Sequence, residues 1–372
     1  MNDILIIGAG YTGMMAAVGV ARRTKAARVT ILNPVDRFNE RLRQHQAAAG
    51  HELAEFRIPD LVEPAGVRFV LGRAAAIDTA AGRVVLDDGR DLHYDTLVYA
   101  LGSRTPQVPN AYTIDDPKLA IALRDKPTGV FTVAGAGLTG IEAATEAAEA
   151  YPDLKVRLVS RGEPGSMMGP KARAHLMKAL DRLGVEVRTG VSVAQVLPDA
   201  VELEGGERLA SDVTLWTTGV QAAPLAAEAG IETDATGRVV VDATLRSVSH
   251  PNIYAIGDAA AIRQAYGVIH GTCQSGIPSG AHTAESIVRE LKGKAPKPFR
   301  FGYIHQPVSL GRGDAVIQFT NPDDTPSRWY LKGRAAVAYK EAVSSSPVKF
   351  YRSRTPIPAR LTGRTGGRRN RL

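Results

Sequence analysis

The chain has 372 residues, enough for two or three domains, and its apolar share of 44% and charged share of 23% are those of a globular protein. Its single cysteine, Cys273, excludes an intrachain disulfide and a Cys-x-x-Cys redox or zinc pair, so we expect no metal and a reducing cytoplasm. The net charge of +8 is carried by residues 349–372, which hold eight Lys or Arg and no acid; 38 basic and 38 acidic residues remain before them, so we expect no nucleic-acid partner.

The first segment has the pattern of a dinucleotide-binding unit. An apolar run, ILII at residues 4–7, indicates a buried parallel strand, and GMMAAVGVARR at residues 13–23 indicates a helix. Between them stand Gly8, Gly10 and Gly13. The first glycine permits a tight turn, the second lets a pyrophosphate approach the backbone at the helix N-terminus, and the third lets the helix pack on the strand. The following strand, RVTILN, completes the unit.

The same unit returns 127 residues later. Gly135, Gly137 and Gly140 follow the apolar run VFTVA, and the strand KVRLVS follows the next helical segment. Two complete units predict two bound dinucleotides. A protein that holds two commonly passes electrons between them, because a flavin accepts a hydride directly from a nicotinamide.

Two further motifs extend the pattern. The strand from Thr96 to Leu101 ends before Gly102, and HPNIYAIGDAAAI gives a short strand that closes on Gly257 and Asp258. With the four motifs in this order, the chain resembles the two-dinucleotide-binding flavoproteins of the pyridine nucleotide-disulfide oxidoreductase superfamily over about residues 2–290. The resemblance implies an α/β fold with two Rossmann-like dinucleotide-binding domains, the second inserted in the first, and a small C-terminal region.

The resemblance assigns the first glycine turn to FAD and the second to NAD(P)H. The implied FAD-binding domain is discontinuous, and the NAD(P)H-binding domain lies between its two parts. We expect the end of the basic tail to be poorly ordered, because it is rich in Arg, Gly and Pro. The implied ranges are 1–106 and 240–300 for FAD, 107–239 for NAD(P)H, 301–348 for the C-terminal region and 349–372 for the tail.

Three positions of the implied FAD site match the family individually. Asn33 lies 20 residues after Gly13, where the family usually has an acid that binds the adenosine ribose; its side-chain oxygen still accepts a hydrogen bond. Asp258 matches the acid that binds the ribityl chain, and Ala74 matches the position whose backbone meets the adenine. The implied FAD residues are Gly8, Gly10, Tyr11, Thr12, Gly13, Asn33, Pro34, Arg41, Gln44, Ala74, Ala100, Gly102, Gly257 and Asp258, and the implied NAD(P)H residues are Gly135, Gly137, Leu138, Thr139, Gly140, Ser160, Arg161 and Gly219.

The coenzyme preference depends on Ser160, which lies 20 residues after Gly140. An acid at that position binds the NAD ribose and repels a 2′-phosphate. Here Ser160 and Arg161 supply a hydroxyl and a cation, which favours NADPH over NADH. The alternative is that Arg161 is a solvated surface residue.

The absence of a cysteine pair reduces the number of flavoprotein families that the chain can resemble. Disulfide reductases and sulfide:quinone reductases need such a pair beside the flavin, so the remaining similarity is to type II NADH dehydrogenases, which pass electrons from a nicotinamide through FAD to a quinone. That similarity places Arg41 and Gln44 near the flavin and the catalytic candidate Glu142 near the nicotinamide. The alternative for Glu142 is an acid stabilised by the helix dipole.

The segment HGTCQSGIPSGAHTAESIVREL carries the second catalytic candidate. Gln274 matches a glutamine of the family's quinone site, but Pro278 and Ser279 replace the glutamines expected after it. We interpret His270 and His282 as structural, because hydride transfer to flavin needs no side-chain base.

Two other reactive side chains have ordinary interpretations. We expect Cys273 to be a small packed side chain rather than a nucleophile. Lys340 resembles a lysine of the family's C-terminal region, and we expect it to be a solvated helix residue.

The predicted reaction is hydride transfer from NAD(P)H to FAD, followed by electron transfer to a quinone-like or other small acceptor. A soluble tailoring flavoenzyme and a redox-sensing flavoprotein are the alternatives. No apolar run reaches the roughly 18 residues of a membrane span, and the family's C-terminal amphipathic helices have no counterpart before the basic tail. We therefore expect a cytoplasmic protein with at most weak peripheral contact, through the tail, with the inner face of the membrane.

Overall fold

The apolar run near the N-terminus forms the middle strand of a five-stranded parallel sheet in the computed structural model, which describes residues 1–358. The run is almost completely buried because both faces of the sheet are covered. The fifth strand, β18, comes from a distant part of the chain and pairs with β7. In spatial order the strands are β18 (Ile253–Ala255), β7 (Thr96–Tyr99), β1 (Asn2–Ile7), β2 (Ala27–Asn33) and β3 (Val67–Leu71).

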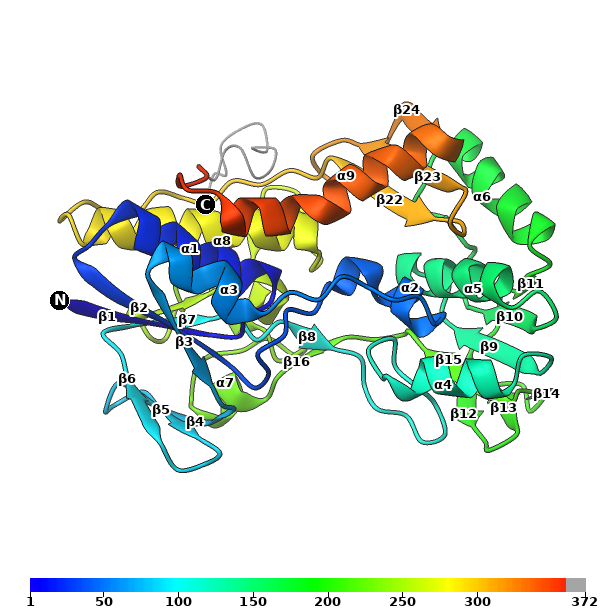
Figure 1. Ribbon diagram of the computed structural model, residues 1–372, viewed down its shortest axis with the longest axis horizontal. Coiled ribbons are helices and arrows are strands. Elements are labelled where there is room, and N and C mark those ends of the chain that lie inside the picture. The colour runs from blue at the N-terminus through cyan, green and yellow to red at the C-terminus, as the bar shows by residue number, and fades with distance from the viewer. Residues whose placement is uncertain (359–372) are drawn as a thin grey trace.

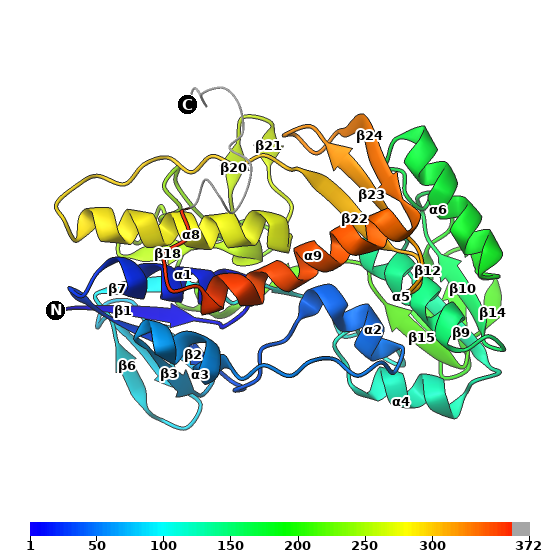
Figure 2. The same ribbon diagram turned by 45° about the horizontal axis from the view of Figure 1, so that its top comes forward.

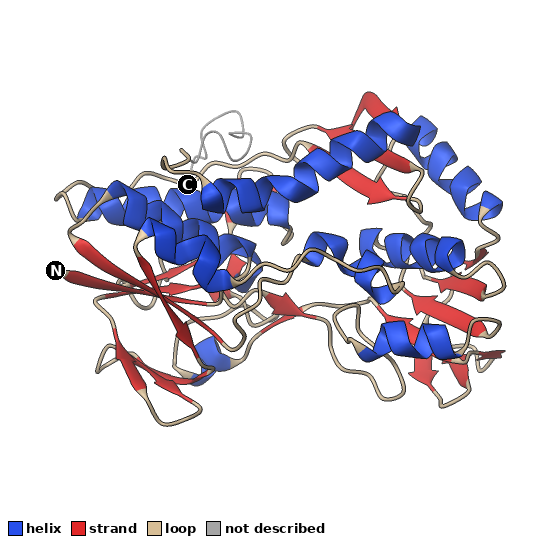
Figure 3. Ribbon diagram, in the orientation of Figure 1, coloured by secondary structure: helices blue, strands red, loops and turns tan. Residues whose placement is uncertain are grey.

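Helices lie along one side of this sheet, and a small three-stranded sheet with a short helix lies on the other (Figure 3). The two longer helices are α1 (Tyr11–Arg23) and α8 (Cys273–Glu290), and they pack closely. A Cβ at Gly280 in α8 would lie 2.4 Å from the carbonyl oxygen of Thr12 in α1, so only glycine fits there. The helices are α1 (Tyr11–Arg23), α3 (Ile58–Val62) and α8 (Cys273–Glu290), and the other side has β4 (Ala74–Asp78), β5 (Arg83–Leu86), β6 (Asp91–His93) and α7 (Leu225–Glu228).

A second parallel sheet occupies the other half of the elongated molecule (Figure 1). Its strands, in spatial order, are β11 (Glu186–Arg188), β10 (Lys155–Val159), β9 (Val130–Ala134) and β15 (Val213–Trp216). The elements around it are α4 (Lys118–Asp125), α5 (Leu138–Ala150), α6 (Pro170–Arg182) and the antiparallel strands β12 (Val193–Val196), β13 (Ala200–Leu203) and β14 (Arg208–Ala210). The predicted α/β fold with two Rossmann-like sheets is confirmed.

Several segments connect the two halves. Strands β8 (Ser103–Arg104) and β16 (Gln221–Ala222) pair antiparallel in the middle of the molecule, and helix α2 (Gln44–Ala48) lies beside α5 (Figure 2). The remaining short elements are β17 (Val239–Val240), β19 (Ala260–Ala261), β20 (Arg263–Gln264), β21 (Gly267–Val268) and the 3₁₀ turns Arg41–Arg43, Glu63–Ala65 and Gly257–Ala259.

The C-terminal region is an antiparallel sheet followed by one long helix. Strands β22 (His305–Ser309), β23 (Ala315–Thr320) and β24 (Pro326–Lys332) lie over the second half, and helix α9 (Gly333–Arg352) runs from them back to α1 (Figure 1). No helix within residues 1–358 is both long and apolar enough to cross a membrane.

The boundary expected for the basic tail was wrong at its start. Residues 349–352 continue α9, and Tyr351 is completely buried although the segment lacks an obvious helical pattern. Its hydroxyl donates to the carbonyl oxygen of Tyr11 at 2.9 Å, and its ring packs edge-on against Phe38. Tertiary packing therefore extends the helix. The expectation of poor order concerns residues 359–372, which lie outside the described part.

Candidate active site

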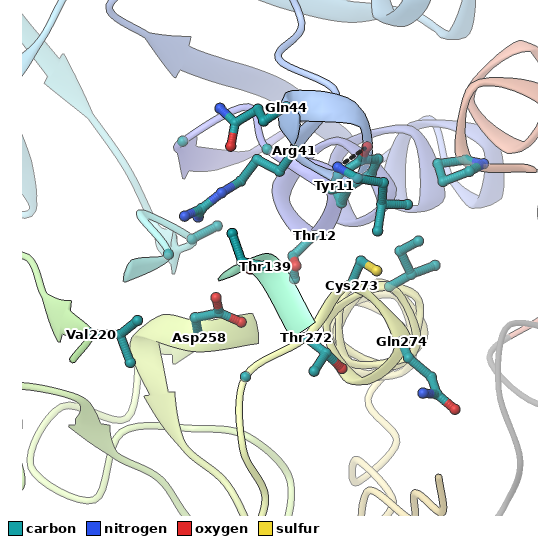
Figure 4. A pocket seen from close by; sticks show the side chains of 18 of the residues that line it. Tyr11, Thr12, Arg41, Gln44, Thr139, Val220, Asp258, Thr272, Cys273 and Gln274 are labelled. Atoms are coloured by element: carbon teal, nitrogen blue, oxygen red, sulfur yellow. Dashed lines mark hydrogen bonds between the residues drawn. The ribbon is translucent and has the colours of Figure 1, made fainter. Parts of the chain in front are cut away.

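A cavity of about 1090 Å³ lies between the two halves and is lined by the first residues of α1 and α8, the first turns of α5 and the middle of α9. Figure 4 shows Arg41 and Gln44 on one side of it and Asp258 on another. Of the predicted site residues, the cavity brings together Gly8, Gly10, Tyr11, Thr12, Asn33, Pro34, Arg41, Gln44, Ala74, Ala100, Gly102, Leu138, Thr139, Glu142, Asp258 and Gln274. It does not include Gly13, Gly135, Gly137, Gly140, Ser160, Arg161, Gly219 or Gly257.

The first glycine turn has the geometry of a phosphate cradle. Gly8 has a φ of +101°, and a Cβ there would lie 2.5 Å from the carbonyl oxygen of Ala100. A Cβ at Gly13 would lie 1.9 Å from the carbonyl oxygen of Gly8, whereas one at Gly10 would meet no atom within 4 Å. Helix α1 begins after Gly10 without a side-chain cap. Its N-terminus is therefore open toward the cavity, where it suits an anion.

The second turn repeats this arrangement. Gly135 has a φ of +118°, and a Cβ at Gly140 would lie 1.9 Å from its carbonyl oxygen. A Cβ at Gly137 would meet nothing within 4 Å, and α5 also begins without a side-chain cap. The two turns thus present the same open helix start, and both fit the pyrophosphate of a dinucleotide.

The second strand of each dinucleotide-binding unit leads to a different side chain: β2 ends at Asn33, and β10 ends two residues before Arg161. Asn33 accepts from the N–H of Ala9 at 2.9 Å and donates to the carbonyl oxygen of Val35 at 2.8 Å, so its amide also holds the first glycine turn in place. Arg161 is exposed beyond β10 and forms no ion pair with any residue of the described part. Its guanidinium is available to a ligand phosphate.

Asp258 is oriented by neighbours from other segments. Its Oδ2 accepts from the hydroxyl of Ser103 at 3.0 Å, and the carbonyl oxygen of Ser103 accepts from Arg41 at 3.1 Å. A Cβ at Gly271 would lie 2.4 Å from Asp258 Oδ1, so this glycine leaves room for the carboxylate.

Burial, with a smaller effect from Asp258, raises the pKa of Cys273 to about 12. The thiol therefore stays protonated at neutral pH, which makes it a poor nucleophile.

Glu142 is held from three directions. Its Oε1 accepts from the ammonium of Lys340 and from the N–H of Ser309, the latter at 3.0 Å, and its Oε2 lies 3.5 Å from Nδ1 of His45. The expectation that Lys340 is solvated was wrong: it is buried, it lines the cavity, and burial followed by repulsion from Arg43 lowers its pKa to about 7. Its four-carbon stem reaches Glu142 because α9 crosses the cavity.

Gln274 uses its amide on the protein backbone. Its Oε1 accepts from the N–H of Ile304 at 2.6 Å, and its Nε2 donates to the carbonyl oxygen of His305 at 2.9 Å. In Figure 4 its side chain points away from Asp258 and Arg41. Gln274 thus fixes the start of β22 against α8.

Ser279 and His282, further along α8, are buried and bind backbone groups of other segments. Ser279 accepts from the N–H of Gly257 at 3.1 Å, and His282 is bonded to the carbonyl oxygen of Lys297 at 2.9 Å. His270 lines the cavity, stacks on Tyr303 with ring centres 4.4 Å apart, and lies 3.3 Å from Asp324.

Sequence reasoning predicted Gln44 on α2 but missed His45 beside it and the contribution of α9 to the cavity. His45 lines it from α2, and Lys340, Val343, Pro347 and Phe350 line it from α9. The available signal was the Lys340–Glu341 pair within the otherwise largely apolar segment AVAYKEAV.

Comparisons with known proteins agree with this architecture. An NADH dehydrogenase-like protein of Mycobacterium tuberculosis is 33% identical over 359 residues, covering 85% of this chain and 87% of that protein. The type II NADH:quinone oxidoreductase of Staphylococcus epidermidis is 28% identical over 361 residues, covering 85% of this chain and 89% of that protein. The solved structure of the sulfide:quinone oxidoreductase of Aquifex aeolicus superposes with a TM-score of 0.82 at 17% identity, covering 96% of this chain and 93% of that one, a likeness of fold alone.

A family model described as pyridine nucleotide-disulphide oxidoreductase matches residues 2–286. The matched range contains both glycine turns, the strand before Gly102 and the strand that closes on Gly257 and Asp258, which are the four motifs that carried the resemblance in the sequence. The chain therefore belongs to the pyridine nucleotide-disulphide oxidoreductase family, and its relatives confirm the predicted similarity to NADH dehydrogenases.

Proposed function

We propose that this protein oxidises NAD(P)H and passes the electrons through FAD to a quinone-like acceptor. The observation that carries the proposal is that the helices that follow the two glycine turns, α1 and α5, both begin at one cavity. Gly8, Gly10 and Thr12 line it from the first unit, and Thr139 and Glu142 line it from the second. Two dinucleotides bound at these turns would extend into a shared space, as hydride transfer requires.

FAD belongs at the first turn, in a domain formed by residues 1–106 and 240–300. Asn33, Ala74 and Asp258 line the cavity from this part of the chain, at the positions expected for the ribose, the adenine and the ribityl chain. NAD(P)H belongs at the second turn, in residues 107–239. The exposed guanidinium of Arg161 supports a preference for NADPH, because it can bind a 2′-phosphate and no acid at position 160 repels one.

The protein side chains provide position and electrostatic field. When bound, the flavin supplies the ring that accepts a hydride and returns two electrons to the acceptor. Lys340 fixes the carboxylate of Glu142 at the cavity wall, Gln274 anchors β22 to α8, and Arg41 and Ser103 orient Asp258. Cys273, with its raised pKa, contributes packing rather than covalent chemistry.

A quinone fits the part of the cavity that is lined by α9. Helix α9 contributes the apolar side chains of Val343, Pro347 and Phe350 to the lining, beside Ser344, Ser346 and Lys340, and these apolar side chains suit an apolar ring. The relative in Staphylococcus epidermidis is named for quinone reduction. The location we propose is cytoplasmic, with weak peripheral contact at the inner face of the membrane through the basic residues beyond α9.

The proposal is tested with the purified protein. It should contain noncovalent FAD, and Asp258→Ala should weaken flavin retention by about 1.5–3 kcal/mol, or roughly ten- to a hundredfold in Kd, because a charge-assisted hydrogen bond is lost. Steady-state oxidation of NAD(P)H should be fastest with a quinone among a panel of small acceptors. Normal flavin content in the Asp258→Ala variant, or no oxidation with any quinone, would contradict the proposal.

A further inference from the structure

Helix α9 has one buried face, and Ser344 stands in the middle of it. The residues of this face recur at the three- and four-residue spacing of a helix. They are Ala336, Lys340, Ser344, Pro347, Val348 and Tyr351. Lys340 bonds to Glu142 in the first turns of α5, and Tyr351 bonds to Tyr11, the first residue of α1. Ser344 lies about one turn after Lys340 and about two turns before Tyr351, so it lies between the starts of α5 and α1.

Three consecutive serines precede a proline in this part of α9, and two of them bond to the helix itself. Pro347 has no backbone N–H, so the carbonyl oxygen of Val343, four residues before it, loses its usual helical donor. The hydroxyl of Ser346 donates to that oxygen at 2.8 Å. The hydroxyl of Ser345 donates in the same manner to the carbonyl oxygen of Ala342, at 3.3 Å. These two serines therefore have a local structural role.

Ser344 differs from both of its neighbours. It is 4% exposed and lines the cavity, and its hydroxyl makes no hydrogen bond with any residue of the described part. The hydroxyl oxygen is not among the side-chain atoms that are sealed off within residues 1–358 without a partner, so it is open to the cavity. A buried hydroxyl without a partner is costly, and alanine would fill this position on the helix face without that cost. Such exceptions are typical of functional groups.

The surroundings of Ser344 restrict what can bond to its hydroxyl. Val343 and Pro347 line the cavity beside it with apolar surface. A ligand that fits here therefore needs an apolar body to pack on these two side chains and an oxygen to accept from the hydroxyl. A carbonyl oxygen accepts a hydrogen bond and needs no donor partner of its own. An apolar ring that carries a carbonyl oxygen meets both requirements.

We propose that Ser344 binds the electron acceptor by donating a hydrogen bond from its hydroxyl to a carbonyl oxygen of the quinone ring. This inference rests on the proposed function, in which a quinone takes electrons from the reduced flavin. As electrons enter the ring, negative charge develops on its oxygens, so a donor fixed beside one of them stabilises the reacting state. Ser344 thus favours acceptors with a ring carbonyl over acceptors that lack one, and it exchanges neither electrons nor protons itself.

Rapid mixing of the reduced, flavin-loaded protein with two acceptors separates this contact from a general defect. With menadione, a quinone, reoxidation of Ser344→Ala should be about three- to tenfold slower at low acceptor concentration, because one neutral hydrogen bond is lost. With ferricyanide, which has no carbonyl oxygen, the variant should reoxidise at the wild-type rate. Ser344→Thr keeps the hydroxyl and should react with menadione faster than Ser344→Ala.

The neighbouring serine provides the matched control. Ser345 adjoins Ser344 but does not line the cavity, so Ser345→Ala should reoxidise with menadione at the wild-type rate. Ser344→Ala removes no hydrogen bond within the described part and should therefore keep the wild-type flavin content and unfolding midpoint. A clear loss of either in Ser344→Ala would assign the hydroxyl to the structure of α9 and overturn its role toward the acceptor.

A second measurement needs no turnover. Isotope-labelled menadione bound to the oxidised protein should show its carbonyl stretching band at lower frequency in wild type and Ser344→Thr than in Ser344→Ala, because a hydrogen bond weakens the C=O bond. The same band position in wild type and Ser344→Ala, wild-type menadione rates in Ser344→Ala, or equal slowing with both acceptors would overturn the contact alone. A wild-type protein that no quinone reoxidises would overturn the proposed function and the contact together.

Discussion

Tyr351, near the end of α9, donates a hydrogen bond from its hydroxyl to the carbonyl oxygen of Tyr11 at the first glycine turn, 2.9 Å away and 340 residues distant in sequence. The ring of Phe38 stands edge-on between the two tyrosine rings, with centroids 5.0 Å from Tyr11 and 5.7 Å from Tyr351. The C-terminal helix thus supports the cradle at the start of α1.

This contact predicts a graded effect of substitution at Tyr351. Tyr351→Phe keeps the ring and loses one hydrogen bond, so it should lower the free energy of unfolding by about 1 kcal/mol. Tyr351→Ala also opens a cavity against Phe38 and should lower it by about 3–5 kcal/mol and weaken flavin retention. Denaturant unfolding and flavin content of the two variants test this. Equal, small losses in both would mean that α9 does not support the turn.

The second glycine turn predicts opposite defects for two neighbouring substitutions. Gly137→Ala places its Cβ in open space with a backbone that alanine readily adopts, so the fold should persist while the KM for NAD(P)H rises. Gly140→Ala drives its Cβ against the carbonyl oxygen of Gly135 and should destabilise the protein by about 1–3 kcal/mol or more. Thermal unfolding and steady-state kinetics distinguish the two; a stable Gly140→Ala protein would contradict the close packing of α5 on β9.

Coenzyme preference is predicted to depend on Arg161. Arg161→Ala should raise the KM for NADPH by roughly tenfold and leave the KM for NADH almost unchanged, because the lost hydrogen bond is to the 2′-phosphate alone. Arg124→Ala, which removes an exposed arginine on α4 away from the cavity, is the matched control. An equal effect of Arg161→Ala on both coenzymes would assign Arg161 to the solvated surface.

Buried Glu146 predicts a pH dependence of stability. Its pKa is raised from 4.5 to about 7, so between these values the folded state holds a proton that the unfolded state releases. Wild-type stability therefore falls relative to Glu146→Gln as the pH rises through this window, by up to about 3 kcal/mol. Urea unfolding of both proteins at about pH 5 and about pH 8 measures the difference, in which other groups cancel. A constant difference would mean that Glu146 is ionised in the folded protein throughout.

The basic tail is predicted to act only as an electrostatic contact. Deleting residues 359–372 removes five arginines and should abolish binding to anionic vesicles while leaving flavin reduction intact. Binding by the intact chain should fall steeply as the Debye length shortens from about 30 Å at low salt to about 8 Å at physiological salt. Sedimentation with neutral and anionic vesicles tests this. Salt-insensitive binding that survives the deletion would indicate an apolar membrane surface elsewhere.

The sequence was most informative where one local geometry permits only glycine. Gly8 and Gly13 are required by a turn and a helix contact within a few residues, so their spacing predicted the cradle and, with the second copy, the fold. It was least informative for α9, where Pro347 inside the helix argues against helical structure. Burial of Val348 and Tyr351 outweighs that local penalty, and this packing depends on segments hundreds of residues away.

The same reason explains the missed side chains of the cavity. Lys340 and Glu142 meet across 198 residues of sequence, and no spacing rule connects them. His45 and Glu146 lie on different helices that become neighbours only when the halves of the molecule assemble. Patterns within one element predicted the cofactor turns, whereas contacts between elements determined which charged groups are buried.

The central claim is most directly tested by anaerobic rapid mixing of the flavin-loaded protein, first with NAD(P)H and then with a quinone. The account predicts that NAD(P)H bleaches the visible flavin absorbance within one turnover and that the quinone restores it at a rate sufficient for steady-state turnover. A reduced protein whose absorbance stays bleached in the presence of quinones would contradict the account and would favour a redox sensor whose reduced state persists.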